Sequence, residues 1–320
     1  MRPQRHLPVC KPRPKGVMIP SAAPPPSSPR PSFVPRAPAA AAQPWLIMDV
    51  GMLWGLDTRF YLAKGFRVVG IEARPDVVAH TRCAFAADIS AGNLEIVHCA
   101  VASRAGPVPF WVFPDKDEWG TLDRGFAERN IGRGLAHHIE TVPGRRFEQV
   151  LAEHGIPYFL KIDIEGADLL CLAALAEFEE RPPYVSIELN LSATEAALEP
   201  LRRLRELGYS RFQLVNQALN PARRPPRPAR EGDYVPTRFA LGTSGLFGAE
   251  LPGRWLDEAA AARRVAAVVR RDQRFGDEGR WANWATAGRA CGRAAAIVRA
   301  RRWWPGALRA AAWYDLHACK

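Results

Sequence analysis

The sequence lacks the patterns that mark several common classes of protein. No two of its six cysteines have the C-x-x-C spacing that is typical of zinc sites and redox centres. No apolar run approaches the roughly 20 residues that a membrane-spanning helix needs. The N-terminus is basic, but it has no apolar stretch like that of a secretory signal. We therefore expect a cytoplasmic protein, without a membrane span, whose cysteines are buried, reduced thiols.

Acidic side chains are missing from the first part of the chain. Residues 1–44 contain seven basic side chains and no acidic one, and Pro, Ala and Ser dominate the segment. A segment of this composition cannot bury enough apolar surface to offset the loss of chain entropy. We predict that residues 1–44 are disordered.

The net charge of +11 lies mainly outside the centre of the chain. Residues 45–220 carry 18 basic and 24 acidic side chains, whereas residues 221–320 carry 19 basic and 9 acidic ones. A strongly basic protein is a candidate for binding nucleic acid. Because the central block is mildly acidic, nucleic acid is not the expected partner. An RNA-binding protein that uses its basic flanks remains the alternative.

From Trp45 onward, strand-like and helical patterns alternate. Apolar runs over residues 45–51, 66–73 and 93–101 enclose helical patterns over 57–65 and 75–88. The alternation continues, with further strands predicted over 106–113, 158–164, 184–190 and 210–217 and helices over 145–155, 166–180 and 193–208. This order is typical of a parallel sheet with helices on both faces. We predict an α/β fold with a doubly wound, mostly parallel sheet.

A glycine-containing loop follows the first predicted strand. It has the pattern D-x-G-x-x-x-G, in which Gly51 and Gly55 lack a Cβ and let backbone approach a ligand. Glu72 ends the second strand, where a carboxylate can accept hydrogen bonds from ribose hydroxyls. The G-x-G-x-x-G loop that holds the pyrophosphate of a dinucleotide is absent. The pattern favours a nucleoside ligand such as S-adenosylmethionine. A structural turn, with Asp49 capping a helix, and a nucleotide-dependent oxidoreductase are the alternatives.

Three stretches of the sequence together resemble one known family. "DVGMLWGLDTRFYLAKGFRVVGIEARP", "FLKIDIEGAD" and "VSIELN" are similar to the FkbM family of S-adenosylmethionine-dependent methyltransferases. The resemblance covers roughly residues 45–250 and the last few residues. It implies a Rossmann-like methyltransferase fold, S-adenosyl-L-methionine as cofactor, and methyl transfer to a hydroxyl oxygen of a sugar, glycan or natural product.

The resemblance also assigns residues to the cofactor. The positions that match the family's binding residues are Asp49, Gly51, Gly55, Glu72, Ala100 and Val101. Glu72 matches the ribose ligand, and Ala100 and Val101 lie where adenine contacts usually fall. Trp54 departs from the family pattern, since many members have a smaller residue in the loop.

The predicted strand before Gly166 carries three charges, Lys161, Asp163 and Glu165. A hydroxyl is a poor nucleophile, so a general base helps as the new bond forms. Asp163 lies at the end of the strand, where we expect it to act as the base or to orient the acceptor. Glu165 is either a residue at the start of the next helix or a second carboxylate for the acceptor. Lys161 lies deeper and needs a carboxylate partner; a purely structural Lys161–Asp163 ion pair is the alternative.

Glu188 ends the next predicted strand at the same edge of the sheet. It is expected to bind the acceptor or to serve as an alternative base, unless it is a solvated strand end. Asp163, Glu165 and Glu188 have oxygens of the kind that Mg²⁺ binds, but their spacing is not diagnostic and we predict no metal. His137 and His138 lie in a predicted polar loop and are expected to be exposed.

The remaining residues are assigned to an extension. Residues 45–250 form the predicted methyltransferase domain, and residues 251–320 form a helical extension rich in Arg, Ala and Trp. Tyr314, Asp315 and His317 either fold back over the site or belong to a solvated tail. The expected partner is a small-molecule or glycan acceptor. An RNA-modifying methyltransferase remains possible as an alternative function.

Overall fold

A computed structural model describes residues 42–275 and 313–320. Their centre is a seven-stranded sheet with the order β3-β2-β1-β7-β8-β10-β9. Its strands are β1 Ala42–Val50, β2 Arg67–Glu72, β3 Leu94–His98, β7 Ile156–Ile162, β8 Tyr184–Glu188, β9 Arg211–Asn216 and β10 Tyr314–Cys319. Every neighbouring pair is parallel except the two pairs that involve β10. The predicted doubly wound, mostly parallel sheet is confirmed.

The chain builds the sheet outward from β1 in both directions. β2 and β3 follow β1 on one side, and β7 and β8 continue the sheet on the other side. The direction of winding therefore reverses between β1 and β7. Open α/β sheets bind ligands outside the carboxyl ends of their strands at such a point. The fold thus places the candidate site where β1 ends at Val50 and β7 ends at Ile162.

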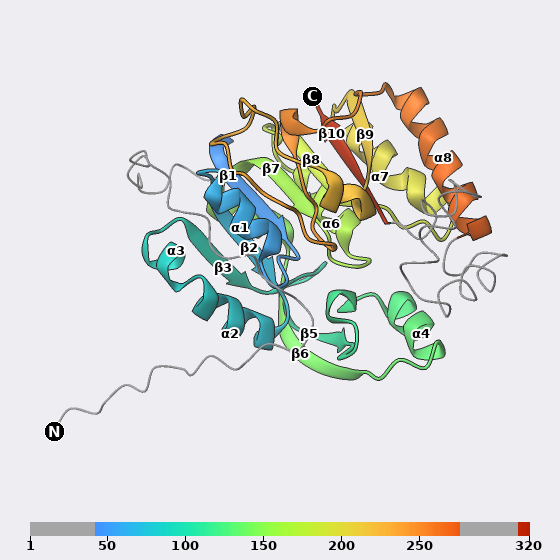
Figure 1. The fold of residues 1–320 in the computed structure, drawn as a ribbon. Helices are drawn as coiled ribbons and strands as arrows, with labels where there is room; N and C mark the ends of the chain where they lie inside the picture. The colour runs from blue at the N-terminus through green and yellow to red at the C-terminus, as the bar shows by residue number, and fades with distance from the viewer. Residues whose placement is uncertain (1–41, 276–312) are drawn as a thin grey trace, which may run out of the picture.

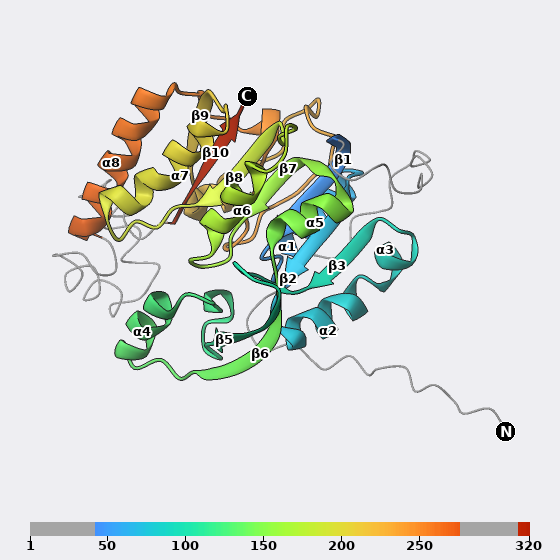
Figure 2. The same ribbon diagram turned by 180° about the vertical axis from the view of Figure 1, so that it is seen from behind.

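Helices cover both faces of the sheet (Figures 1 and 2). One face packs against α5 Phe147–His154, α6 Asp168–Leu175, α7 Thr194–Glu206 and α8 Glu258–Phe275. The other face packs against α1 Leu56–Ala63, α2 Pro75–Ala84 and parts of residues 235–251, while α3 Ala86–Ser90 follows α2. The side chains of each strand alternate between the two faces, so Leu160 and Ile162 belong to the first core and Phe159 to the second.

A second, three-stranded sheet lies beside the carboxyl ends of the main strands. It consists of β4 Ala100–Val101, β5 Gly106–Val112 and β6 His138–Arg145, in the order β4-β6-β5. The 3-10 turn η1 Asp117–Trp119 and the helix α4 Arg124–Gly132 connect β5 to β6. β5 was expected from the sequence, whereas β6 and α4 were not. Further short turns are η2 Gln217–Ala222 and η3 Gly248–Glu250.

The C-terminal strand corrects the predicted extension. α8 is helical as expected, but residues 314–319 form β10 between β8 and β9 (Figure 1). Asp315 and His317 are each only 2% exposed, so the alternative of a solvated tail is wrong. The main sheet therefore contains residues from both sides of the predicted domain boundary at residue 250. Most of residues 251–320 lie outside the described part.

The structure corrects two further predictions in part. β1 begins at Ala42, so residues 42–44 are part of a strand and not disordered, while residues 1–41 lie outside the described part. Cys99, Cys171 and Cys319 are free thiols, whereas Cys83 takes part in a disulfide that the sequence did not predict. Among the described residues, no helix has the length and apolar character to cross a membrane.

Candidate functional site

The loop after β1 is a tight turn whose amides are used within the protein. The amides of Gly51 and Met52 both donate to the carbonyl of Ile71, at 2.9 and 3.1 Å. The amide of Leu53 donates to Glu72 Oε2 at 2.9 Å. Leu53 has a φ of 45°, a conformation that a residue with a side chain adopts only under constraint. The loop is therefore fixed to the end of β2 before any ligand binds.

The two glycines of the loop make room for the protein itself. A Cβ on Gly51 would lie 1.9 Å from the carbonyl oxygen of Asp163, and φ at Gly51 is +80°. A Cβ on Gly55 would lie 2.6 Å from the ring of Phe85. Gly51 thus joins the ends of β1 and β7, and Gly55 packs the loop against Phe85 between α2 and α3. Their predicted closeness to a cofactor stays a prediction.

Glu72 is a buried carboxylate held at both oxygens. Besides the Leu53 amide on Oε2, the amide of Arg74 donates to Oε1 at 2.8 Å. Burial raises the pKa of Glu72, and these amide hydrogen bonds oppose the rise. The side chain is 7% exposed. Each carboxylate oxygen has a second lone pair, so both remain able to accept a further hydrogen bond.

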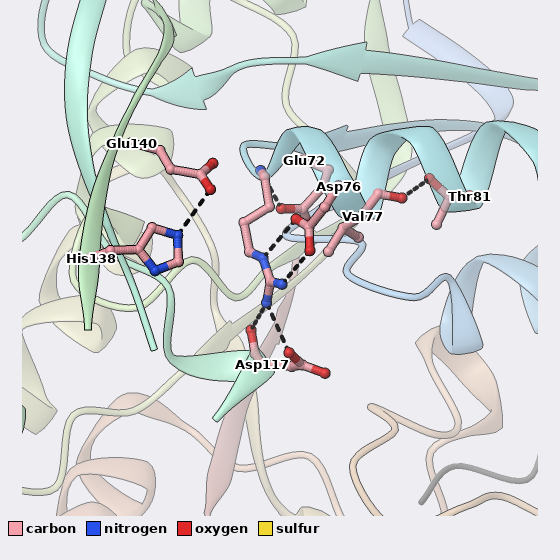
Figure 3. Close-up of polar contacts among 8 residues, drawn as sticks. Glu72, Asp76, Val77, Thr81, Asp117, His138 and Glu140 are labelled. Atoms are coloured by element: carbon pink, nitrogen blue, oxygen red, sulfur yellow. Dashed lines mark hydrogen bonds and ion pairs between the residues drawn. The ribbon is translucent and has the colours of Figure 1, made fainter. Parts of the chain in front are cut away.

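Arg74 connects this carboxylate to the loop of the small sheet (Figure 3). Its guanidinium donates two hydrogen bonds to Asp76, at 3.1 and 2.6 Å, and two to Asp117, both at 3.1 Å. Asp76 is in the first turn of α2, and Asp117 begins η1. Arg74 therefore ties η1 to the strand end that carries Glu72.

The same segment reaches the loop after β7. We call residues 113–123 the bridging loop. Thr121 in it is fully buried, and its hydroxyl donates to the carbonyl of Glu165 at 2.5 Å. A Cβ on Gly166 would lie 2.7 Å from the Cβ of Asp123. The bridging loop thus contacts the ends of β2 and β7, two of the strand ends where the sequence placed site residues.

Lys161 is a buried cation at the centre of this arrangement. Its Nζ lies 3.3 Å from Asp49 Oδ1 and 3.5 Å from Asp163 Oδ2, and it donates to the carbonyl of Gly51 at 3.0 Å. Burial opposes the charge of Lys161, but the nearby carboxylates, Asp49 and Asp163 first, outweigh it and raise the pKa. The predicted pairing of Lys161 with a carboxylate is confirmed. Thr58 donates to the other oxygen of Asp49 at 2.6 Å.

Three adjacent strands place carboxyl groups next to one another. Asp163 follows β7, Glu188 ends β8, and Asp315 is paired in register with Glu188. Burial raises the pKa of Glu188 well above its usual range, with further contributions from Asp163, Glu165 and Asp315. Burial, followed by the charge of Asp163, raises the pKa of Asp315 to about 7, although a hydrogen bond with Gln217 opposes the rise. We call Asp163, Glu188 and Asp315 the acidic row.

Glu165 does not begin a helix as one prediction had it. It lies in the loop before α6 with a φ of 52°, and α6 starts at Asp168. The carboxylate of Asp168 accepts hydrogen bonds from the amides of Ile164 and Gly166, at 3.1 and 2.9 Å, which closes the loop. Burial, then the charges of Asp163 and Asp168, raise the pKa of Glu165 well above its usual range. Its role as a second carboxylate stays a prediction.

The remaining predicted residues lie around these groups. Ala100 and Val101 form β4, are buried, and pair with Gly144 and Arg145 of β6. The amide of Cys99 donates to the carbonyl of Glu72, so β4 begins directly beside the buried carboxylate. His137 and His138 are exposed as predicted, but His138 begins β6 and does not lie in a loop. Within residues 42–275 and 313–320, no three His, Cys, Asp or Glu side chains are arranged to hold a metal ion.

Some residues of the site were not found from the sequence. Arg74 and Thr121 act through loops that are distant in sequence, and no local pattern indicates their partners. Asp168 had a weak signal, since a carboxylate is favourable in the first turn of a helix, but its hydrogen bonds to the amides of Ile164 and Gly166 follow no local pattern. Both carboxylate oxygens of Asp57 accept a hydrogen bond from the amide of Ser244, at 3.0 and 2.9 Å. Burial raises the pKa of Asp57 to about 6.

Comparison with known proteins places the site inside one family match. Residues 49–211, just over half of the chain, match the family model described as the methyltransferase FkbM domain. The match contains the loop after β1, Glu72, Asp163 and Glu188, while Asp315 lies outside it. A comparison with curated proteins found no match.

Two solved structures were also found to be similar. One is the methyltransferase FkbM from Methylobacillus flagellatus KT, with 16% identity and a TM-score of 0.34. That match covers 55% of this chain and 40% of the other, so the chain corresponds to less than half of the solved protein. The second is the precorrin-6y C5,15-methyltransferase from Geobacter metallireducens GS-15, with 10% identity, a TM-score of 0.33, and coverage of 88% and 83%.

Proposed function

The chain belongs to the FkbM methyltransferase family, and we propose that it transfers a methyl group from S-adenosyl-L-methionine to a hydroxyl oxygen of a sugar, glycan or natural product. The proposal rests on the hydrogen bonding of the loop after β1. Its amides at positions 51, 52, 53 and 55 all donate to acceptors within the protein. Glu72, by contrast, keeps lone pairs that can accept hydrogen bonds from two ribose hydroxyls.

The residues around Glu72 fit a nucleoside better than a dinucleotide. A pyrophosphate needs free backbone amides at the start of a helix, and the amides of residues 51, 52, 53 and 55 in this loop already donate within the protein. Glu72, the loop from Gly51 to Gly55, and β4 with Ala100 and Val101 would hold the ribose and adenine of the cofactor. When bound, S-adenosylmethionine supplies a methyl group that its sulfonium has already activated. The alternative of a nucleotide-dependent oxidoreductase is therefore not favoured.

The acidic side chains on the other side of β1 would act on the acceptor. Asp163 lies beside the turn at Gly51, since the Asp163 amide donates to the carbonyl of Val50 at 3.0 Å. Lys161 fixes the direction of the Asp163 carboxylate. Asp163 can then accept the proton of the hydroxyl or hold it in line for transfer, with Glu188 and Glu165 as further acceptors of hydrogen bonds. Orientation and removal of this proton are what the chain itself must provide.

An RNA-modifying methyltransferase is less well supported. The described site is lined mainly by carboxylates, which would repel a phosphate backbone. Much of the basic C-terminal part lies outside the described residues.

The proposal is tested by calorimetry with S-adenosylmethionine and with NAD. We expect the protein to bind S-adenosylmethionine and not NAD. Glu72→Gln should weaken S-adenosylmethionine roughly 10- to 100-fold, because it removes charge-assisted hydrogen bonds to the ribose. Glu95→Gln, at the opposite end of the neighbouring strand β3, is the matched control and should bind normally. No binding of S-adenosylmethionine to the folded wild-type protein, or preferential binding of NAD, would reject the proposal.

A further inference from the structure

Five aromatic side chains follow one another along the amino edge of the main sheet. We call them the aromatic row, and they are Trp45, Phe66, Tyr158, Tyr184 and Trp255. In that order, the centroids of neighbouring rings lie 5.6, 5.8, 5.5 and 6.2 Å apart. The first four belong to the first half of β1, the residue before β2, and the starts of β7 and β8. Because parallel strands begin at one edge and end at the other, the aromatic row lies on the side opposite to the candidate site.

The described chain covers the aromatic row only in part. Phe66 is buried in the second core, while Tyr158, Tyr184 and Trp255 pack against that core and stay half-buried. Trp45 is 55% exposed. Single apolar side chains are common on protein surfaces, but a continuous group of exposed rings marks a surface that binds a partner. The aromatic row is therefore a candidate docking surface.

The aromatic row also presents hydrogen-bond donors. The hydroxyl of Tyr158 already donates to Glu231 Oε2 at 2.7 Å. Within residues 42–275 and 313–320, by contrast, the indole N–H groups of Trp45 and Trp255 donate no hydrogen bond. An indole N–H is a donor only. The complementary ligand has apolar surface and hydrogen-bond acceptors, and needs few donors of its own.

The chain that precedes β1 has this composition. Residues 1–41 contain 12 of the 29 prolines, and the stretch "PPPSSPRPSFVPRAP" spans residues 24–38. A proline offers an apolar ring and a carbonyl oxygen but no N–H. The stretch has the spacing P-x-x-P twice, at Pro26 and Pro29 and at Pro35 and Pro38. In a polyproline II helix these prolines share one face, about 9 Å apart, and such segments dock into grooves lined by aromatic rings.

The place where the described chain begins favours docking within the same chain. β1 begins at Ala42, and Trp45, the first ring of the aromatic row, follows three residues later. Pro38 is thus only seven positions from Trp45 along the chain. A tether of this length keeps the segment at an effective concentration in the millimolar range. Even a weak preference of prolines for the rings is then enough to populate the docked state.

We propose that residues 24–38 dock onto the aromatic row of their own chain as a polyproline II helix. The prolines pack between the rings, and backbone carbonyls of the segment accept hydrogen bonds from the indoles of Trp45 and Trp255. This inference does not depend on the proposed function. A glycan also packs on aromatic rings, but its hydroxyls bring donors as well as acceptors, and nothing tethers it to this edge.

The test is photo-cross-linking of the full-length protein. Phe33, which lies inside the segment, is replaced by p-benzoylphenylalanine, and cross-linked peptides are identified by mass spectrometry after irradiation. Unlabelled and ¹⁵N-labelled proteins are mixed in equal amounts, so a cross-link within one chain carries a single isotope and a cross-link between two copies carries both. We expect cross-links within one chain, to peptides that contain Trp45, Tyr158, Tyr184 or Trp255.

A variant of the aromatic row tests whether the rings hold the segment. Trp45→Ala should reduce the yield of these cross-links roughly 10-fold, because it removes both the exposed ring and a donor. Leu241→Ala is the matched control, since it shortens another apolar side chain that is 64% exposed. The yield in this control should equal that of the wild type.

Variants of the segment test the same contact without changing any described residue. Replacement of Pro26, Pro29, Pro35 and Pro38 by Ser should also reduce the yield roughly 10-fold, because it removes the rings and the preference for polyproline II. The control makes the same replacement at four prolines outside the segment. These are Pro3, Pro8, Pro12 and Pro14. Its yield should match that of the wild type.

Three results would overturn the proposal. The first is the absence of cross-links to the aromatic row, which would leave the row to another partner, such as a glycan. The second is cross-links to the row only between two copies, which would make the row an interface between chains. The third is cross-links to the row whose yield stays unchanged in both Trp45→Ala and the variant of the segment's prolines. None of these results bears on the binding of S-adenosylmethionine, which is measured separately.

Discussion

Lys161 shows how a single side chain links structure and site. It is 4% exposed and lies between Asp49 and Asp163, which end neighbouring strands. Removing one partner of a buried ion pair is costly because it leaves a charge without compensation. Asp49 therefore holds Lys161 in place, and Lys161 presents its cation to the partly exposed carboxylate of Asp163, whether Asp163 takes the proton or only orients the hydroxyl. The structural ion pair and the catalytic role are compatible with each other.

Asp163→Asn tests the role of this carboxylate. An amide cannot accept the proton, so we expect the rate of methyl transfer to fall about 100- to 10,000-fold, the range typical of general bases. Binding of S-adenosylmethionine should change much less. The rate is measured with S-adenosylmethionine labelled in its methyl group and a panel of sugars. Full methyl transfer by Asp163→Asn with normal cofactor binding would rule out Asp163 as the base.

Among the elements, β10 most changes the description of the molecule. It completes the sheet between β8 and β9 and brings Asp315 to the acidic row. Because β10 runs antiparallel to its neighbours, its first residues lie at the edge where β7 and β8 end. The bridging loop closes the same edge from the other side, through Arg74 and Thr121.

Leu316→Ala tests how much β10 contributes to the stability of the fold. Leu316 is completely buried in the core against α5 to α8. The substitution should lower the free energy of unfolding by about 2–5 kcal/mol, as is usual when a buried leucine is truncated. Chemical denaturation measures the change. Lys320→Ala, at an exposed residue just after the strand, should change stability by less than about 0.5 kcal/mol. Equal stability of the two variants would contradict a core position for β10.

The elements also show what a sequence can predict. The parallel strands of the main sheet were predicted because each is an apolar run next to a helical pattern. β6 and β10 were missed because they contain polar residues, and β6 also has Pro143 and Gly144. Glu72, Lys161 and Asp163 could be proposed as site residues because strand ends meet at one edge of a parallel sheet. Contacts such as Arg74 with Asp117 depend on how distant loops pack, which no local pattern records.

On the scale of the whole molecule, buried ionisable groups couple stability to pH. Burial raises the pKa of Asp315 from 3.8 to about 7 and lowers the pKa of His317 from 6.5 to about 3. Asp315 thus costs stability as pH rises, since the folded state keeps a proton that the unfolded chain has released. His317 costs stability as pH falls below 6.5, since only the unfolded chain gains a proton. The two effects oppose each other between pH 4 and 7.

Asp315→Asn separates these two effects. Between pH 4 and 7 the folded wild-type protein binds more protons at Asp315 than the unfolded chain does, so stability from this group falls as pH rises. Asparagine does not titrate, so the variant does not lose this stability as pH rises. Its free energy of unfolding relative to wild type should therefore increase by on the order of 4 kcal/mol from pH 4 to pH 8. Melting temperatures of both proteins across this range give the difference. A constant difference would show that Asp315 titrates normally.

The place of β10 in the sheet also sets an order of events during synthesis. Asn216 at the end of β9 and Tyr314 at the start of β10 are hydrogen-bonded although 98 positions separate them. At roughly 5–20 residues per second, a ribosome needs about 5–20 seconds to make that stretch. During this time β8 has an unpaired edge and β9 has no partner strand in the sheet, and such unpaired edges can recruit other chains. The nascent protein can thus assemble the loop at Glu72 early, but it acquires Asp315 only when β10 arrives.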